Sequence, residues 1–367
     1  MDWRLETCPG SAAQALEGHG MADQELAALL EPLRRLSARL GADRHLIQGA
    51  GGNTSIKRNE KELWVKASGT WLSAAMEKPI FVGLDLRDLR HRLANGEAEP
   101  ALPACLEPGS TLRPSIEATL HALLPHCVVL HVHSVNAIAF AVRADGRALV
   151  AERLAGLRWA WVPYAKPGLP LTRAVQVVMP ARPDILLLGN HGLVVGGDNA
   201  EAAEALLAEV EQRLCWAPRP SSSADLVALH RLAACSSGRY RPAKLAVAHA
   251  AATDPAAARI ASQGALYPDH VVFLGVSPQP VMSTREAESA LSKNREYFAP
   301  TIVLVENLGV LIRSDLGAGA EEMAACLGLV LPRIDPAAPL VFLSAEQEAE
   351  LLDWDAEKYR QSLNAAS

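Results

Sequence analysis

Two histidines, His131 and His133, lie two residues apart in the apolar segment VVLHVHSV, which the sequence predicts to be a buried strand. Alternate residues of a strand point to the same side, so the two imidazoles share one face, roughly 6–7 Å apart. From that spacing their nitrogens can converge on one cation at about 2.0–2.1 Å each. Burying two such rings without partners is costly, so the pair favours a metal site. Two core histidines bonded to backbone carbonyls are the alternative.

The best candidate for a third ligand is His191, in the segment PDILLLGNHGLVVGG (183–197). This segment predicts a strand, a tight turn at Asn190–Gly192 and a second strand. Gly192 permits a sharp bend, and functional groups often lie at such turns. Three neutral imidazoles with an open coordination position are typical of a catalytic metal site. The metal there acts as a Lewis acid on a carbonyl or hydroxyl oxygen.

Glu117 is the expected acid/base, in the first turn of a helix predicted over 114–124 and capped by Ser115. The positive end of the helix dipole favours its ionised form. On spacing alone, an ordinary first-turn glutamate is the alternative. His121 lies four residues further on the same helix face and could orient the carboxylate, although a structural histidine is the stronger expectation.

Two glycine-containing segments, QGAGGNTSIK (48–57) and VKASGTWL (65–72), combine glycine with hydroxyl and amide side chains. Neither matches a P-loop, and neither has the GxGxxG pattern of a dinucleotide site. Their backbone N–H groups and hydroxyls could bind a small anion such as phosphate. Flexible turns are the alternative.

Five motifs, GGNTSIK, KASGT, PSIEATLHA, HVH and GNHG, occur in this order over about residues 25–215. The set resembles the class II aldolase/adducin family, which includes fuculose- and rhamnulose-1-phosphate aldolases and ribulose-5-phosphate 4-epimerase. The second half, with YPDHVVFLG (267–275), resembles the extended aldolase region of bifunctional rhamnulose-1-phosphate aldolase/lactaldehyde dehydrogenases. No dinucleotide motif accompanies it, so the dehydrogenase part is not expected here.

The resemblance implies a three-layer α/β/α sandwich with a mostly antiparallel central sheet, and a homo-oligomer. It implies a divalent metal, most often zinc, on His131, His133 and His191, with Glu117 as the acid/base. The implied reaction cleaves a ketose 1-phosphate to dihydroxyacetone phosphate and an aldehyde. The substrate and its phosphate are expected near a set of loop residues, with Lys66 and His121 in support: Gly52, Asn53, Thr54, Ser68, Gly69, Thr70 and Ser115.

One departure from the family pattern bears on the phosphate. Many of these aldolases carry a second serine just before the glutamate, and Ile116 stands there in this chain, so one phosphate contact is expected to be missing. Several other functions fit the same residues. A sugar-phosphate epimerase, a dehydratase or a sugar-acid decarboxylase would need the same metal site. An iron oxygenase on the three histidines and a non-catalytic, adducin-like binding protein are further alternatives.

The elements that must position these residues alternate between strands and helices, which is typical of α/β proteins. Strands are predicted over 62–68 and 78–86, and a helix over 199–216. Leucines at helical spacing predict a helix over 22–40, and Pro32 predicts a kink or a second helix start within it. We expect a flexible arm (1–20), a catalytic domain (21–216), a linker (217–225) and a C-terminal domain (226–367).

One segment of the expected C-terminal domain is similar in sequence to a segment of the first half. PDILLLGNHGLVVGGD (183–198) aligns with PTIVLVENLGVLIRSD (300–315), with Asn307 at the place of Asn190 and Leu308 at that of His191. We interpret this as a degenerate aldolase-like repeat that lacks the metal histidine and has a structural or lid role. Chance similarity of two apolar hairpins is the alternative.

Composition limits the other functions. The chain has 367 residues, a net charge of −6 and no block of basic residues, so nucleic acid is not an expected partner. The six cysteines form no CxxC pair, which favours reduced thiols in the cytoplasm. Neither a signal peptide nor an apolar run of about 18 residues is found, so no membrane contact is expected.

Overall fold

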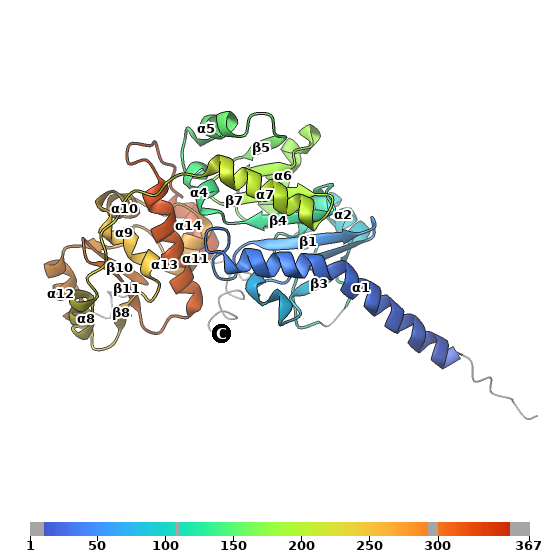
Figure 1. The fold of residues 1–367 in the computed structure, drawn as a ribbon, viewed down its shortest axis with the longest axis horizontal. Helices are drawn as coiled ribbons and strands as arrows, with labels where there is room; N and C mark the ends of the chain where they lie inside the picture. The colour runs from blue at the N-terminus through green and yellow to red at the C-terminus, as the bar shows by residue number, and fades with distance from the viewer. Residues whose placement is uncertain (1–10, 108–109, 293–299, 353–367) are drawn as a thin grey trace, which may run out of the picture.

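The structure, a computed structural model, describes residues 11–107, 110–292 and 300–352. Figure 1 shows the two halves of the chain side by side, the first in blue to green and the second in yellow to red. The predicted arm lies outside the described residues up to residue 10, and its remainder belongs to the first helix, which begins at Ser11. That helix continues through Pro32 to Ala42, so no second helix starts there.

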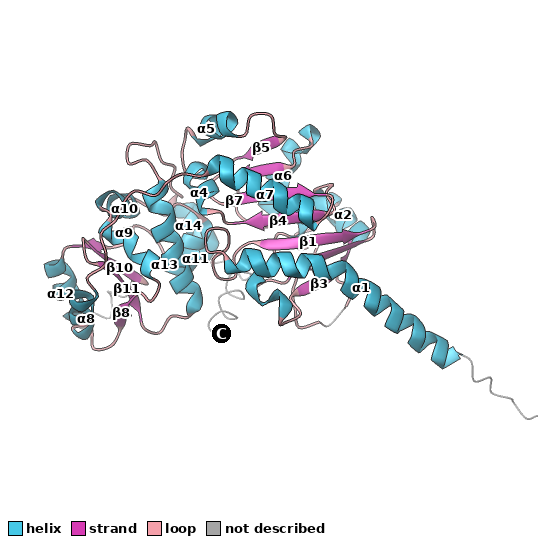
Figure 2. Cartoon of the chain, in the orientation of Figure 1, coloured by secondary structure: helices cyan, strands magenta, loops and turns pink. Residues whose placement is uncertain are grey.

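A seven-stranded sheet in the order β3-β2-β1-β4-β7-β6-β5 forms the centre of the first half (Figure 2). Its neighbouring strands pair antiparallel, except for β5 and β6, which are parallel. The predicted α/β class is confirmed. The sheet differs from the expected mostly antiparallel one in being mixed, because β5 and β6 pair in parallel. The strands are β1 (Asn53–Arg58), β2 (Glu62–Lys66), β3 (Phe81–Asp85), β4 (Val128–Val132), β5 (Trp159–Val162), β6 (Ile185–Leu188) and β7 (Gly192–Gly197).

Helices cover both faces of this sheet. α1 and α7 pack on one face, and α2, α3 and α6 pack on the other. The helices of this half are α1 (Ser11–Ala42), α2 (Leu86–Ala94), α3 (Ala118–Leu123), α4 (Val135–Ala141), α5 (Gly146–Arg153), α6 (Leu169–Val178) and α7 (Ala200–Leu214), with 3₁₀ turns η1 (Leu72–Met76) and η2 (Met179–Ala181).

Strand β4 is buried on both faces, which explains its continuous apolar sequence. Val128 and Leu130 point toward α1 and α7, whereas Val129 points toward α3 and α6. Each of these side chains contributes roughly 1.5–3 kcal/mol by leaving water. Because strand residues alternate, His131 shares the face of Val129. The strand therefore directs this imidazole toward α3, next to Glu117.

The second half is built on a four-stranded sheet in the order β8-β11-β10-β9. Its strands are β8 (Tyr240–Pro242), β9 (Val281–Met282), β10 (Ile302–Val305) and β11 (Gly309–Arg313). Its helices are α8 (Leu226–Ala234), α9 (Ala250–Thr253), α10 (Pro255–Ala261), α11 (Pro268–Leu274), α12 (Thr284–Ser292), α13 (Ala318–Val330) and α14 (Ala345–Leu352), with 3₁₀ turns η3 (Ala246–His249) and η4 (Leu331–Arg333).

The two hairpins that the sequence aligns are both present. β6–β7 and β10–β11 each turn through an asparagine in the left-handed region, with φ 51° at Asn190 and 59° at Asn307. The order β8-β11-β10-β9 also matches β4-β7-β6-β5 in strand direction. No described strand of the second half corresponds to β1, β2 or β3. A repeat of the whole aldolase-like domain is therefore not confirmed, and the domain boundaries remain predictions.

The two halves share an apolar core through α4, which begins two residues after His133. Val135, Ile138 and Val142 of this region pack among apolar side chains of the second half, including Leu327 and Leu331. In the described part of the chain, no helix is long and apolar enough to cross a membrane.

Candidate active site

The three predicted histidines come together in the structure. His131 lies in β4, His133 follows that strand, and His191 lies in the turn between β6 and β7. Their ring centroids are 4.9 to 5.2 Å apart, and one nitrogen of each lies within 4.8 Å of the others. All three are buried. The fold therefore brings His191 next to two histidines that lie more than 50 positions earlier in the sequence, and the three form a group that could hold a metal ion.

Hydrogen bonds set the orientation of the first two rings. His131 Nδ1 lies 3.2 Å from the Leu193 carbonyl oxygen, and His133 Nδ1 lies 3.0 Å from the Asp269 carboxylate. Because both partners are acceptors, each Nδ1 carries the hydrogen and each Nε2 keeps its lone pair. The two Nε2 atoms are 3.2 Å apart, close to the roughly 3.3 Å expected of two ligands on one tetrahedral cation.

Burial favours the neutral, metal-binding form of His131 and His191. It lowers the pKa of His131 and, despite the nearby Glu117 carboxylate, lowers that of His191 to about 3. Two buried atoms, His191 Nδ1 and the Glu117 carboxylate oxygen Oε1, have no hydrogen-bond partner among the described residues. Unpaired buried atoms in such a group fit a bound cation and its ligands.

Glu117 faces the histidines from the start of α3. Its Oε2 lies 3.4 Å from His131 Nε2, and its Oε1 lies 3.6 Å from His191 Nε2. Burial raises the pKa of Glu117, but the histidines and an Asn53 hydrogen bond outweigh it and lower the value to about 2. Glu117 is the N-cap residue rather than a first-turn residue, and Ser115 Oγ accepts from its N–H instead of capping the helix.

A chain of hydrogen bonds holds this carboxylate. Asn53 Nδ2 donates to Glu117 Oε2 at 2.9 Å, so Asn53 Oδ1 is left to accept from His121 Nε2. His121 Nδ1 then accepts from the Ser55 hydroxyl at 2.7 Å. Burial lowers the pKa of His121 to about 3, which keeps the ring neutral. His121 thus acts on Glu117 through Asn53, a connection that the helical spacing alone did not indicate.

The predicted substrate residues divide into two groups. A small cavity of about 40 Å³ beside the histidines is lined by most of them: Gly52, Asn53, Lys66, Ser68, Gly69 and Ser115. Thr54 and Thr70 are not among its lining residues, so their expected role stays a prediction without support from this cavity. Thr54 hydrogen-bonds Ser37 on α1, because its position in β1 places it on the opposite face from Asn53. The Thr70 hydroxyl donates to the Ala67 carbonyl.

A larger pocket of about 500 Å³ adjoins this cavity and shares Ser68, Ser115 and other lining residues with it. Its wall includes three basic side chains, Arg113, Lys166 and Arg173, and one acidic side chain, Glu99. The basic residues come from separate loops and a helix, so no sequence pattern linked them. The pocket has the size usual for small-molecule ligands and a positive lining suited to an anion.

The second half contributes Asp269, the second residue of α11, to the cavity. In the sequence, its segment YPDHVVFLG was informative only through its resemblance to the extended aldolases. The role of Asp269 depends on its contact with His133, and no local sequence pattern predicts a contact between such distant segments.

The neighbouring His270 supports a test of stability. Its side chain is fully buried against Tyr267, neither ring nitrogen has a partner among the described residues, and burial lowers its pKa to about 4. The unfolded chain binds this proton below about pH 6.5 and the folded chain does not, so stability falls as the pH falls toward 4. His270→Phe is expected to remove about 2 kcal/mol of that loss between pH 7.5 and pH 5.

Urea unfolding at the two pH values measures this effect. Any packing cost of the phenyl ring is the same at both, so the difference between them isolates the charge. An identical pH dependence in the wild-type and variant proteins would contradict the prediction.

The fold and the site define an α/β protein with a candidate metal centre beside a buried carboxylate. The chain belongs to the class II aldolase and adducin family: the family model for the class II aldolase and adducin N-terminal domain matches residues 33–216. This confirms the resemblance that the five motifs indicated.

One curated relative is a Bacillus subtilis (strain 168) protein described as the uncharacterized oxidoreductase YuxG. It is 35% identical over 213 residues, which cover 52% of this chain and 31% of that protein. This chain therefore spans about a third of the length of that relative.

Two similar solved structures carry class II aldolase descriptions. The N-terminal class II aldolase domain of a conserved Thermoplasma acidophilum protein has a TM-score of 0.45 and 22% identity, covering 58% of this chain and 95% of that chain. L-fuculose-1-phosphate aldolase from Thermus thermophilus has a TM-score of 0.35 and 18% identity, covering 51% and 92%.

Proposed function

We propose that this protein cleaves a ketose 1-phosphate of the rhamnulose or fuculose type to dihydroxyacetone phosphate and an aldehyde. The observation that carries the proposal is the clustering of three histidines with an ionised Glu117 beside one small cavity, in a chain of the class II aldolase family. The three nitrogens leave coordination positions open for a substrate, which suits catalysis rather than a structural metal.

His131, His133 and His191 would hold the divalent ion, and nitrogen ligands in this number suit Zn²⁺. When bound, such an ion polarises the substrate oxygens and stabilises negative charge that develops on them. Glu117 is placed to hold the proton exchanged at C3 of the substrate. The hydrogen bond from Asn53 fixes the direction in which this carboxylate points.

The adjoining pocket offers room for the rest of the substrate. Ser68 and Ser115 line both spaces, so a ligand that contacts them can extend from the histidines toward Arg113, Lys166 and Arg173. Three basic side chains against one acidic side chain, Glu99, favour a phosphorylated or otherwise anionic sugar over a neutral one. We place the phosphate among the basic groups.

The test is a panel of ketose 1-phosphates and their unphosphorylated forms, followed by chromatography of all products. The expected result is release of an aldehyde and dihydroxyacetone phosphate from at least one phosphorylated ketose. If the product is an epimer, a dehydrated sugar or carbon dioxide, the site catalyses epimerisation, dehydration or decarboxylation instead of aldol cleavage. Failure of the whole panel to yield an aldehyde would overturn the proposal.

A further inference from the structure

The contact between Asp269 and His133 joins the two halves of the chain inside the cavity. Asp269 Oδ2 lies 3.0 Å from His133 Nδ1, and the two side chains are only 6% and 8% exposed. A charge-assisted hydrogen bond in such a dry place is stronger than one at the surface. Its geometry leaves His133 Nε2 directed toward His131 and His191.

The loop before β1 is shaped around this contact. A Cβ atom at Gly51 would lie 2.9 Å from His133 Nδ1 and 3.2 Å from Asp269 Oδ2. Both distances are too short for a side chain to be added without movement of the pair. The backbone of Gly51 therefore covers the hydrogen bond and excludes other groups from it.

Other hydrogen bonds fix the segment that carries Asp269. The side-chain amide of Asn190, next to His191, donates to the carbonyl oxygens of Leu266 and Val341 at 2.9 and 2.7 Å. Leu266 lies just before α11, so the turn that carries one histidine is tied to the segment that supports another.

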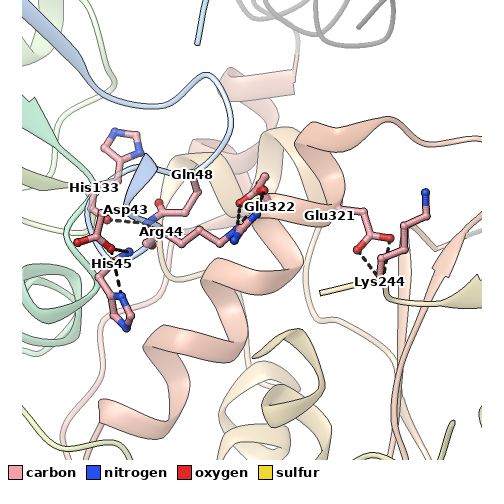
Figure 3. A network of polar contacts seen from close by, with 8 residues as sticks. All are labelled: Asp43, Arg44, His45, Gln48, His133, Lys244, Glu321 and Glu322. Carbon is pink, nitrogen blue, oxygen red and sulfur yellow. Dashed lines mark hydrogen bonds and ion pairs between the residues drawn. The ribbon is translucent and has the colours of Figure 1, made fainter. Parts of the chain in front are cut away.

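A second link lies nearby and is shown in Figure 3. The Arg44 guanidinium pairs with Glu322 of α13, with a shortest distance of 2.8 Å. Gln48, one turn along the chain, donates to the backbone oxygens of Arg44 and His133. This link joins the same two halves without touching a histidine ring, so it provides a matched control.

We propose that the second half completes the metal centre, with Asp269 as a positioning residue that holds His133 in its metal-binding tautomer and raises its affinity for a divalent cation. This inference rests on the proposed metal-binding role of the three histidines. A carboxylate that accepts from the far nitrogen of a histidine ligand orients the ring and makes the ligand more basic. Here that carboxylate comes from outside the region that the family model matches, residues 33–216.

The test measures metal binding in the absence of substrate. Apo forms of the full chain are titrated with Zn²⁺ in competition with a chelator, and with Co²⁺ followed by its visible absorption spectrum. Asp269→Ala is expected to weaken Zn²⁺ binding about 10- to 100-fold and to change the Co²⁺ spectrum. Asp269→Asn should lose less Zn²⁺ affinity than Asp269→Ala, because its amide oxygen still accepts the hydrogen bond. It should still lose some, because that oxygen carries no negative charge. Glu322→Gln should bind Zn²⁺ like the wild type.

Unchanged Zn²⁺ affinity in Asp269→Ala would overturn the inference, as would an equal loss in Glu322→Gln, which would assign the effect to docking of the halves. If Asp269→Ala does not fold, an unchanged affinity in Asp269→Asn overturns it. A wild type that binds metal but cleaves no ketose phosphate would refute the proposed reaction and leave the role of Asp269 standing. A wild type that binds no metal would refute both.

Discussion

His191→Ala is expected to abolish turnover together with tight metal binding. The side chain supplies one of three nitrogens in the cluster, and its ring is held neutral by burial, as a metal ligand must be. Two histidines in one strand segment leave a cation without enough protein ligands for a catalytic site. Treating the wild-type protein with a chelator should have the same effect on activity.

Metal analysis of anaerobically purified protein and steady-state assays measure this result. Adding the metal back should restore the chelated wild type and leave His191→Ala inactive. His126→Ala is a suitable control, since His126 lies in the same half but pairs with Asp184 at 2.9 Å and is not part of the cluster. Full activity in the chelated wild type would rule out the proposed chemistry, and iron as the native metal would favour the oxygenase alternative.

Glu117→Gln is expected to lower kcat by about 10²- to 10⁴-fold while the metal stays bound. Glutamine has nearly the same shape and can still accept the hydrogen bond from Asn53 through its amide oxygen. It cannot take up or return a proton near neutral pH, whereas the pKa of Glu117 lies at about 2 and its carboxylate is available. The loss should therefore appear in the rate and not in metal content.

Glu211→Gln provides the comparison for this variant. Glu211 is a largely buried glutamate of the same half, bonded to Asn136, and burial raises its pKa. It does not line the cavity, so its replacement should leave kcat close to that of the wild type. A Glu117→Gln enzyme with kcat within a few-fold of the wild type would show that another group transfers the proton.

The sequence predicted the grouping of the three histidines because the information for it is local. His131 and His133 follow from two-residue spacing in an apolar strand, and His191 from a turn that contains Gly192. The strands and helices around them show the apolar periodicity that their burial requires. Glu117 was found because helix starts have a recognisable composition, although the helix begins later than expected, at the residue after it.

The features of the site that the sequence did not predict depend on contacts between segments that are distant in the chain. The face of β1 on which Thr54 lies is set by strand pairing, so a glycine-rich motif could not show that it points toward α1. The link from His121 to Glu117 needs Asn53 from a neighbouring strand. Asp269 comes from α11, more than 130 residues after His133, and its role becomes visible only when the two halves are docked.

The two hydrogen bonds of Asn190 to the backbone of Leu266 and Val341 tie the turn that carries His191 to the second half of the chain. Linkage is reciprocal, so any factor by which this tie strengthens cation binding at His191 is also the factor by which the cation strengthens the tie. A cation bound by His131, His133 and His191 would therefore stabilise the contact between this turn and the segment that precedes α11.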